Sequence, residues 1–303
     1  MSTEIKAEQK EMQKTEKMKI EIKDLSFVYS KGTAFEKTAL NHINISIVKG
    51  EFIGLIGHTG SGKSTLIQHM NSLLKPTSGH IFIDGEDINI DKSRLKAIRS
   101  KVGLVFQYPE HQLFEMTVFK DVAFGPSNSG LSEQEIKERV VSSLEIVGIS
   151  EDNYQKSPFE LSGGQKRRVA IAGVLAMRPE VLILDEPAAG LDPRGRDEIL
   201  GRIKEMHKKL GLTVVLVSHS MEDIAKLVSR IIVINKGQIV MTQTPAEIFE
   251  NPEILESMGL SAPQTSYVIK ALRARGFDLP KGIYTVDAAV EAIFANLKGL
   301  KNE

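Results

Sequence analysis

The 303-residue sequence contains no cysteine. It can therefore build neither a disulfide framework nor a thiolate metal site. It also lacks any run of about 18 apolar residues, which argues against a membrane-spanning helix. The segment from Met1 to Lys19 is polar and mixed in charge, so it has no apolar stretch typical of a signal peptide. These absences favour a cytoplasmic protein that is held at a bilayer only by a partner.

An excess of either charge is also missing. Lysine and arginine together number 39, and so do aspartate and glutamate, so no global field favours nucleic acid or anionic lipid. Hydrophobic residues make up 41% and charged residues 26%, an ordinary globular composition that can build a sizeable core. The length suggests one large domain with an appendage, or two domains.

The chain is organised around a glycine-rich stretch, Gly57-His-Thr-Gly-Ser-Gly62-Lys63-Ser64. It follows an apolar run at 52–56 and leads into a helical pattern at 65–70, the context that the motif G-x-x-x-x-G-K-[ST] requires. Glycines let successive backbone N–H groups point at phosphate oxygens, and the helix N-terminus adds further donors. Lys63 would contact the β- and γ-phosphates, and Ser64 would offer its hydroxyl to Mg²⁺. The alternative is a turn that merely joins a strand to a helix. The predicted nucleotide-binding residues here are Gly57, His58, Thr59, Gly60, Ser61, Gly62, Lys63, Ser64 and Thr65.

Apolar strands alternate with helical patterns along much of the chain, which predicts an α/β fold with a mostly parallel sheet. Several of these strands are followed by polar residues, which would meet at the carboxyl edge of the sheet. Asp185 could reach a Mg²⁺ ion, and Glu186 could take a proton from an attacking water. Gln107 and His219 end other strands. Each of these four residues alone would be interpreted as a solvated loop residue, but together they could contact one terminal phosphate.

Antiparallel strands are predicted near both ends of this region. Alternating patterns at 19–29 and 40–48 indicate half-buried strands, with Lys49-Gly50 expected to close the hairpin. A second pair, 230–235 and 238–242, turns at Lys236-Gly237. Residues 1–18 are predicted to form a flexible tail.

The segment Leu161-Ser-Gly-Gly-Gln165 precedes a helical pattern and resembles the signature motif of ATP-binding-cassette (ABC) ATPases. The resemblance covers residues 19–245 and includes, in the expected order, a Walker A loop, a Q-loop glutamine, the signature, a Walker B strand, a D-loop and a switch histidine. It implies a P-loop ATPase with a RecA-like core, an antiparallel β subdomain and an α-helical signature subdomain. It also implies ATP and Mg²⁺ as cofactors.

The same resemblance implies roles for individual positions within one subunit. Tyr29 would stack on adenine, although it could be an ordinary strand tyrosine. Glu186 would be the catalytic base, and His219 would contact the γ-phosphate. Gln107 would contact the metal or water and report the nucleotide state to a partner, and the metal set would be Ser64, Gln107 and Asp185. Ala188 departs from the threonine of many relatives, but no phosphate contact is attached to that position.

Other positions would act across a head-to-tail dimer. Ser162, Gly163, Gly164 and Gln165 would meet the γ-phosphate of a nucleotide held by the opposite subunit, and Asp192 would couple the two sites. ATP would then join the subunits, and its hydrolysis would release them.

Two stretches, 105–126 and 167–177, narrow the resemblance to the ATPases of energy-coupling-factor (ECF) vitamin and metal transporters, and to the second of their two paralogues. This implies a heterodimer with the other paralogue, although a homodimer stays open, and a peripheral location on the cytoplasmic side of the cell membrane. A transmembrane scaffold subunit would dock near Phe114–Phe124, and a separate membrane subunit would bind the substrate. The apolar residues at helical spacing are Phe114, Val118, Phe119 and Val122, which could instead face the chain's own core.

Other functional classes remain as alternatives. One is the ATPase of another ABC importer. A soluble ABC ATPase acting on nucleic acid or ribosomes is less favoured, because the chain has a single cassette, no long insertion between Gln107 and Leu161 and no basic stripe. We therefore expect no nucleic-acid partner. A subunit that only binds ATP is disfavoured by the intact Glu186 and His219.

Residues 246–303 are predicted to be a small helical C-terminal domain. Thr244-Pro-Ala-Glu247 combines a cap, a proline and a glutamate typical of a helix start, and further helices are expected over 263–275 and from 285. An apolar face of the last helix must be buried on the chain's own body or on a second subunit. The resemblance favours dimerisation. This face consists of Val286, Val290, Ile293, Phe294 and Leu297.

Overall fold

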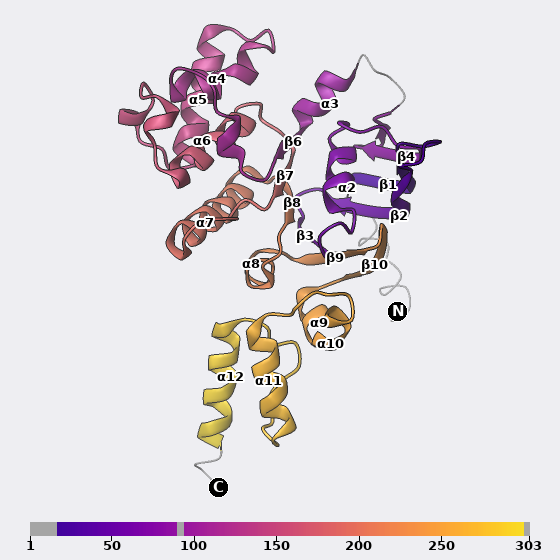
Figure 1. The fold of residues 1–303 in the computed structure, drawn as a ribbon. Coiled ribbons are helices and arrows are strands. Elements are labelled where there is room, and N and C mark those ends of the chain that lie inside the picture. Colours follow the sequence, from indigo (N-terminus) through magenta and orange to yellow (C-terminus); the bar gives the residue numbers. More distant parts are fainter. Residues whose placement is uncertain (1–16, 90–93, 300–303) are drawn as a thin grey trace, which may run out of the picture.

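A computed structural model of the chain describes residues 17–89 and 94–299 (Figure 1). Residues 1–16 of the predicted tail, which spans 1–18, lie outside the described residues. The described chain contains two β-sheets with helices around them, which confirms the predicted α/β class. No helix within these ranges has the length and apolar character needed to cross a membrane.

The core sheet has the strand order β10-β9-β3-β8-β7-β6. All neighbouring strands are parallel except β10, which pairs antiparallel with β9. The central strands are buried on both faces, which explains why they read as continuous apolar runs. The strands are β3 (Phe52–Ile56), β6 (Val102–Val105), β7 (Val181–Asp185), β8 (Thr213–Val217), β9 (Arg230–Asn235) and β10 (Gln238–Gln243).

The second sheet is antiparallel, with the order β2-β1-β4-β5. The prediction that Lys49-Gly50 closes a hairpin is wrong. β1 turns back through residues 30–36 to pair with β2, and Lys49-Gly50 instead leads the chain out of this sheet into β3 at the centre of the other. The physical reason is that β3 is apolar on both faces and cannot lie in a half-exposed sheet. The strands are β1 (Met18–Tyr29), β2 (Lys37–Val48), β4 (Ser78–Ile83) and β5 (Glu86–Asp87).

Two hydrophobic clusters lie on opposite faces of the core sheet, because successive side chains of a strand point to opposite sides. Val181 and Ile183 of β7 belong to the cluster that packs against the antiparallel sheet and helix α2 (Lys63–Met70). Leu182 and Leu184 belong to the cluster that packs against the helices on the other face. The glycine-rich loop 57–62 (the phosphate loop) therefore connects β3 to helix α2, which packs between the two sheets.

A helical subdomain follows β6 and lies apart from the antiparallel sheet (Figure 1). Its helix α4 includes Pro126, and a capping box formed by Ser132 and Glu135 begins the next helix. Val118 and Val122 are fully buried in the chain's own core, which is the alternative that the sequence left open for them, whereas Phe114 and Phe124 are exposed. The helices are α4 (Val118–Ser127), α5 (Glu133–Ile146) and α6 (Gly163–Leu175), preceded by the short α3 (Leu95–Lys101).

The chain after β10 forms helices that pack in two places. The first two bury Ile248, Phe249 and Leu255 in the main core, and the last two pack around a small separate core of Ile269, Leu279 and Ala289. Thr244 caps the first of them through the predicted capping box. On the last helix, Ile293 packs against this core, but Val286 is 67% exposed and Phe294 60% exposed. Most of the predicted apolar face is therefore not covered by the chain itself. The helices are α9 (Pro245–Phe249), α10 (Pro252–Glu256), which was not predicted, α11 (Gln264–Ala274) and α12 (Val286–Gly299).

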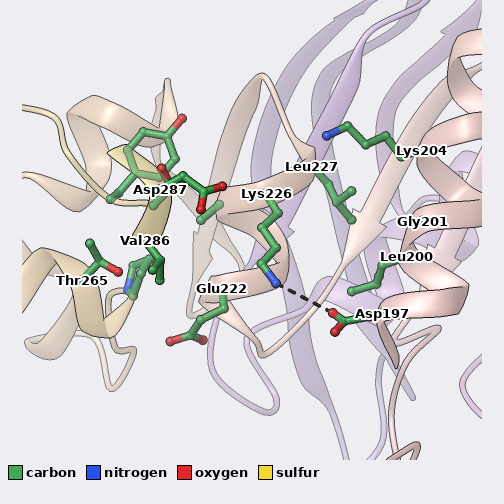
Figure 2. Close-up of a pocket in the computed structure, with 14 residues that line it drawn as sticks. Asp197, Leu200, Gly201, Lys204, Glu222, Lys226, Leu227, Thr265, Val286 and Asp287 are labelled. Carbon is green, nitrogen blue, oxygen red and sulfur yellow. Dashed lines mark ion pairs between the residues drawn. The ribbon is translucent and has the colours of Figure 1, made fainter. Parts of the chain in front are cut away.

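A cavity of about 760 Å³ separates these C-terminal helices from α7 (Pro193–Leu210) and α8 (Met221–Leu227) of the core (Figure 2). Charged side chains of both signs line it, and Lys226 pairs with Asp197 at 3.8 Å on its core side. None of the residues that line this cavity belongs to the phosphate loop.

Lys19 ties the two sheets together. Its buried ammonium donates to both carboxylate oxygens of Asp84, at 2.9 and 2.8 Å, and to Glu180 Oε2 at 2.5 Å. Asp84 follows β4 in the antiparallel sheet, and Glu180 precedes β7 in the core sheet. Burial alone would raise the pKa of Asp84, but the hydrogen bonds and charge of Lys19 hold this pKa below its usual value.

We expect Lys19→Met to lower the free energy of unfolding by about 2 kcal/mol, since the carboxylates would lose their cation while remaining partly buried. Denaturant unfolding measures this change. The matched control is Lys23→Met, because Lys23 is exposed and its ion pair with Glu21 faces solvent. A loss for Lys19→Met no greater than that of the control would contradict the linking role.

Candidate active site

The phosphate loop between β3 and α2 requires glycine at defined positions. A Cβ on Gly57 would lie 2.3 Å from the Ile234 carbonyl oxygen and 2.5 Å from Ser61 Oγ, so no side chain fits there. Gly60 and Gly62 have φ values of +79° and +112°, a region that other residues rarely adopt. The motif thus builds a tight loop whose backbone amides precede a helix N-terminus, an arrangement suited to phosphate.

Lys63 lies across this loop. Its Nζ donates to the carbonyl oxygens of Gly57 at 2.5 Å and His58 at 3.1 Å. Burial lowers the pKa of the amine, and the charges of Glu186 and Asp185 partly oppose this effect. A buried ammonium with only backbone oxygens as hydrogen-bond partners is a fitting partner for an anion.

Ser64 and Asp185 face one another beside the loop. Ser64 Oγ donates to Asp185 Oδ2 at 3.5 Å. Burial raises the pKa of Asp185, and Lys63 and Ser64 oppose this. The hydroxyl of Ser61 is buried and has no hydrogen-bond partner among the described residues. The Ser64 hydroxyl and the Asp185 carboxylate, side by side at the phosphate loop, form the donor set that a nucleotide-bound Mg²⁺ would use.

Glu186 follows β7 directly and has a left-handed backbone, with φ of +50°. Its Oε1 atom is buried and has no hydrogen-bond partner within the part of the chain that the structure describes. His219 Nε2 lies 3.4 Å from this atom. Burial, and next the charge of Asp185, raise the pKa of Glu186 to about 7, while Lys63 opposes them. Burial and Lys63 lower the pKa of His219. An unusual backbone conformation and a buried carboxylate oxygen without a hydrogen bond, both at Glu186, indicate a functional constraint.

Two further predicted residues lie at the edge of this group. Tyr29 is partly exposed, packs edge-on against Phe27 and shares a hydrogen bond of 3.1 Å with Thr65 Oγ1 on α2. Gln107 is exposed just after β6, whose pairing with β7 places it at the same sheet edge as Asp185. The structure thus gathers the residues predicted for one subunit around the phosphate loop.

The signature residues do not join this group within one chain. Ser162 caps α6, and its capping box with Gln165 is formed in both directions, at 3.3 and 3.0 Å. α6 and α2 belong to different layers of the molecule (Figure 1). A Cβ on Gly163 or Gly164 would meet nothing within 4 Å, and as the first residues of a helix they carry N–H groups without an intrahelical partner. Asp192 also acts as a cap, since its Oδ1 accepts a bond from Gly195 N at 2.6 Å.

Asn235 was not predicted at the site. Its side-chain oxygen lies 3.2 Å from His58 Nε2, so it holds the second residue of the phosphate loop. The available signal was its position at the end of apolar strand β9, the same pattern that identified Gln107, Asp185 and His219.

The tight glycine loop, the buried lysine, the Ser64–Asp185 pair and the Glu186 carboxylate form the site of a P-loop ATPase. A model of the ABC transporter family matches residues 40–189, which identifies an ATPase of the ABC class. The protein of Caldanaerobacter subterraneus subsp. tengcongensis named energy-coupling factor transporter ATP-binding protein EcfA2 is 59% identical over 285 residues, covering 94% of this chain and 100% of that protein. The chain belongs to the family of energy-coupling factor transporter ATP-binding proteins. Its relative of the same name in Clostridium tetani is 58% identical over 90% of this chain and 95% of that protein.

Solved structures agree with this class. The structure of cbiO1 from Clostridium perfringens, described as part of the ABC transporter complex cbiONQ, has a TM-score of 0.72 and 40% identity, covering 84% of this chain and 100% of that one. The cassette MJ0796, solved as a dimer in a post-hydrolysis state with ADP and Pi, has a TM-score of 0.66 and 31% identity, covering 74% and 98%. The predicted fold, a P-loop ATPase of the ABC type, is confirmed.

We expect Gly57→Ala to weaken ATP binding by about tenfold or more, since the added methyl group would press on the Ile234 carbonyl and reshape the phosphate loop. Binding of a fluorescent ATP analogue measures the change. Gly201→Ala on α7 is the matched control, because a Cβ there meets nothing within 4 Å. Equal affinities of the two variants would contradict the requirement for a glycine at 57.

Proposed function

We propose that this chain is the ATP-binding and ATP-hydrolysing subunit of an ECF-type importer, peripheral on the cytoplasmic side of the cell membrane, that powers uptake of vitamins or metal ions. Family membership supports the transporter class, and one observation carries the hydrolytic role. This is the buried Oε1 atom of Glu186, directly after β7, which has no hydrogen-bond partner among the residues that the structure describes. A subunit that only binds ATP would not require a buried carboxylate in that position.

The residues of the loop fit ATP with Mg²⁺. The amides of residues 57–62, the ammonium of Lys63 and the hydroxyls of Ser64 and Thr65 would hold the phosphates, and Tyr29 beside Thr65 would lie against the base. Ser64, Asp185 and Gln107 would hold the metal. When bound, Mg²⁺ supplies positive charge that neutralises the phosphate oxygens during transfer to water.

Within the chain, Glu186 would accept a proton from the attacking water. Its pKa of about 7 means that burial makes this carboxylate more basic than an exposed one. His219, 3.4 Å away, would orient this carboxylate and contact the terminal phosphate. Lys63 would balance part of the negative charge of the phosphates, which the two neighbouring carboxylates would otherwise repel.

The open signature residues support action in trans. The free N–H groups of Gly163 and Gly164 at the start of α6 form an anion-binding helix terminus, yet the chain's own phosphate loop lies in another layer. We infer a head-to-tail pair of ATPases in which Ser162, Gly163, Gly164 and Gln165 meet the partner's nucleotide. Asp192 at the start of α7 would couple the two sites. The partner would be the second paralogous ATPase or another copy of this chain.

Membrane partners would contact the exposed aromatic surface formed by Phe114 and Phe124, together with the exposed Met116. Met116 is 77% exposed, and the rings of Phe114 and Phe124 meet edge-on at 5.0 Å. A short helix of a transmembrane scaffold subunit would pack here, and a separate membrane subunit would bind the substrate. The exposed face of α12 would contribute to subunit contact between the ATPases.

We expect Glu186→Gln to bind ATP as the wild type does but to lose turnover by about 100-fold or more, because the amide cannot accept the proton from water. Phosphate release by the assembled complex measures turnover. Size-exclusion chromatography with ATP should also show a stable pair of closed ATPases. Glu205→Gln, a change at an exposed position of α7, is the control. Near-normal hydrolysis by Glu186→Gln would show that another group is the base.

Gly164→Ala should leave ATP binding by this chain within about twofold of the wild type but lower turnover of the complex by about tenfold or more, because the methyl group would stand between the helix terminus and the partner's nucleotide. The control is Gly173→Ala on the same helix, where a Cβ likewise meets nothing within 4 Å. Similar turnover of both variants would argue against action of the signature in trans.

A further inference from the structure

Arg167 is a buried charged residue whose contacts reach two different loops. It lies on α6, just after the signature residues, and is only 2% exposed. Its Nε and Nη2 atoms donate to the two carboxylate oxygens of Glu110, at 3.0 and 2.6 Å. Its Nη1 atom donates to the carbonyl oxygens of Pro187 at 3.1 Å and Ala189 at 2.6 Å. One guanidinium therefore joins a side chain and two backbone groups.

The carboxylate end of this network lies in the segment between Gln107 and the exposed aromatic surface. Glu110 belongs to the short 3₁₀ helix Pro109–Gln112, which precedes Phe114. Burial would raise the pKa of Glu110, but the hydrogen bonds from Arg167 outweigh it and hold this pKa below its usual value. The pair is therefore charged, and its bidentate geometry fixes the position of the 3₁₀ helix against α6.

The carbonyl end lies directly after the proposed base. Pro187 follows Glu186 in the chain, and Ala189 N donates to the Glu186 carbonyl at 3.1 Å. The two carbonyls that Arg167 holds thus belong to the turn that leaves Glu186, whose own backbone is left-handed. Moving this turn would move the carboxylate, because no flexible residue separates them.

We propose that Arg167 is a positioning residue for hydrolysis, which joins segment 108–114, directly before the proposed membrane-facing segment 114–124, through Glu110 to the turn that places Glu186. This inference rests on the proposed function, in which Glu186 is the base and segment 114–124 meets a membrane subunit. A displacement of the segment by that subunit is carried through a rigid guanidinium to the turn after the base. Lysine could not replace arginine, because a single ammonium lacks the planar fork that bonds a carboxylate on one edge and carbonyls on another.

The test uses the assembled transporter that contains this chain, its partner ATPase and the membrane subunits. Arg167→Lys keeps the charge but loses the fork, and we expect kcat for ATP to fall about tenfold or more while KM stays within about twofold. The matched control is Arg168→Lys on the same helix. Arg168 pairs with Glu198 of α7 and, among the described residues, donates no hydrogen bond to either loop, so the kcat of this variant should match the wild type.

A second variant acts from the other end and protects the test against misfolding. Glu110→Gln keeps the shape of the side chain but removes its charge, and its kcat should also fall while its thermal midpoint, although lowered, stays above the assay temperature. If the two residues act as one unit, the double variant Glu110→Gln with Arg167→Lys should lose no more kcat than the more affected single variant. Independent, multiplying losses would overturn the connection.

The outcomes separate this inference from the proposed function. A wild-type complex that hydrolyses ATP, a Glu186→Gln complex that does not, and an Arg167→Lys or Glu110→Gln complex with kcat equal to the Arg168→Lys control would leave the function standing and refute the positioning role. A wild-type complex without hydrolysis would instead refute the proposed function itself. A loss expressed in KM alone would also contradict the positioning role, since it would place Arg167 in nucleotide binding.

Discussion

The rest of the site depends on the interactions of the buried Lys63 ammonium. It is anchored to the carbonyls of the phosphate loop and lies near two carboxylates that burial makes unfavourable to ionise, Asp185 and Glu186. A single cation cannot balance these carboxylates and a triphosphate as well, so the site needs a further positive charge and further donors. The glycine loop, the Ser64–Asp185 pair and the metal that they would share meet part of that need.

The remaining donors lie on the same chain but in a different layer from its own phosphate loop. Gly163 and Gly164 begin helix α6, where N–H groups have no intrahelical partner, and a Cβ on either would meet nothing within 4 Å, which leaves room for a partner's phosphate. Two chains facing head to tail would complete each other's sites, and loss of the terminal phosphate would weaken both interfaces together. Arg167 would then extend this coupling toward the membrane-facing segment through Glu110.

Local patterns were sufficient for much of this structure, because strands buried on both faces and motifs that bind phosphate have strict sequence requirements. The mostly parallel direction of the core strands followed from the alternation of strands and helices, and the capping boxes at Ser132 and Thr244 were visible in the sequence. Local patterns could not predict the features that depend on contacts between distant segments of the chain. The sheet joined by β2 and the burial of Val122 depend on which elements pack together, and the Arg167–Glu110 pair joins residues far apart in the chain.

The central claim, that two ATPase subunits close over nucleotide, is tested most directly by a distance between them. The chain has no cysteine, so Glu138→Cys on the exposed side of α5 would carry one spin label, and the partner ATPase would carry the other. Pulsed electron paramagnetic resonance on the assembled complex should show a shorter and narrower distance distribution with a non-hydrolysable ATP analogue than with ADP. Identical distributions in a complex that hydrolyses ATP would contradict the account.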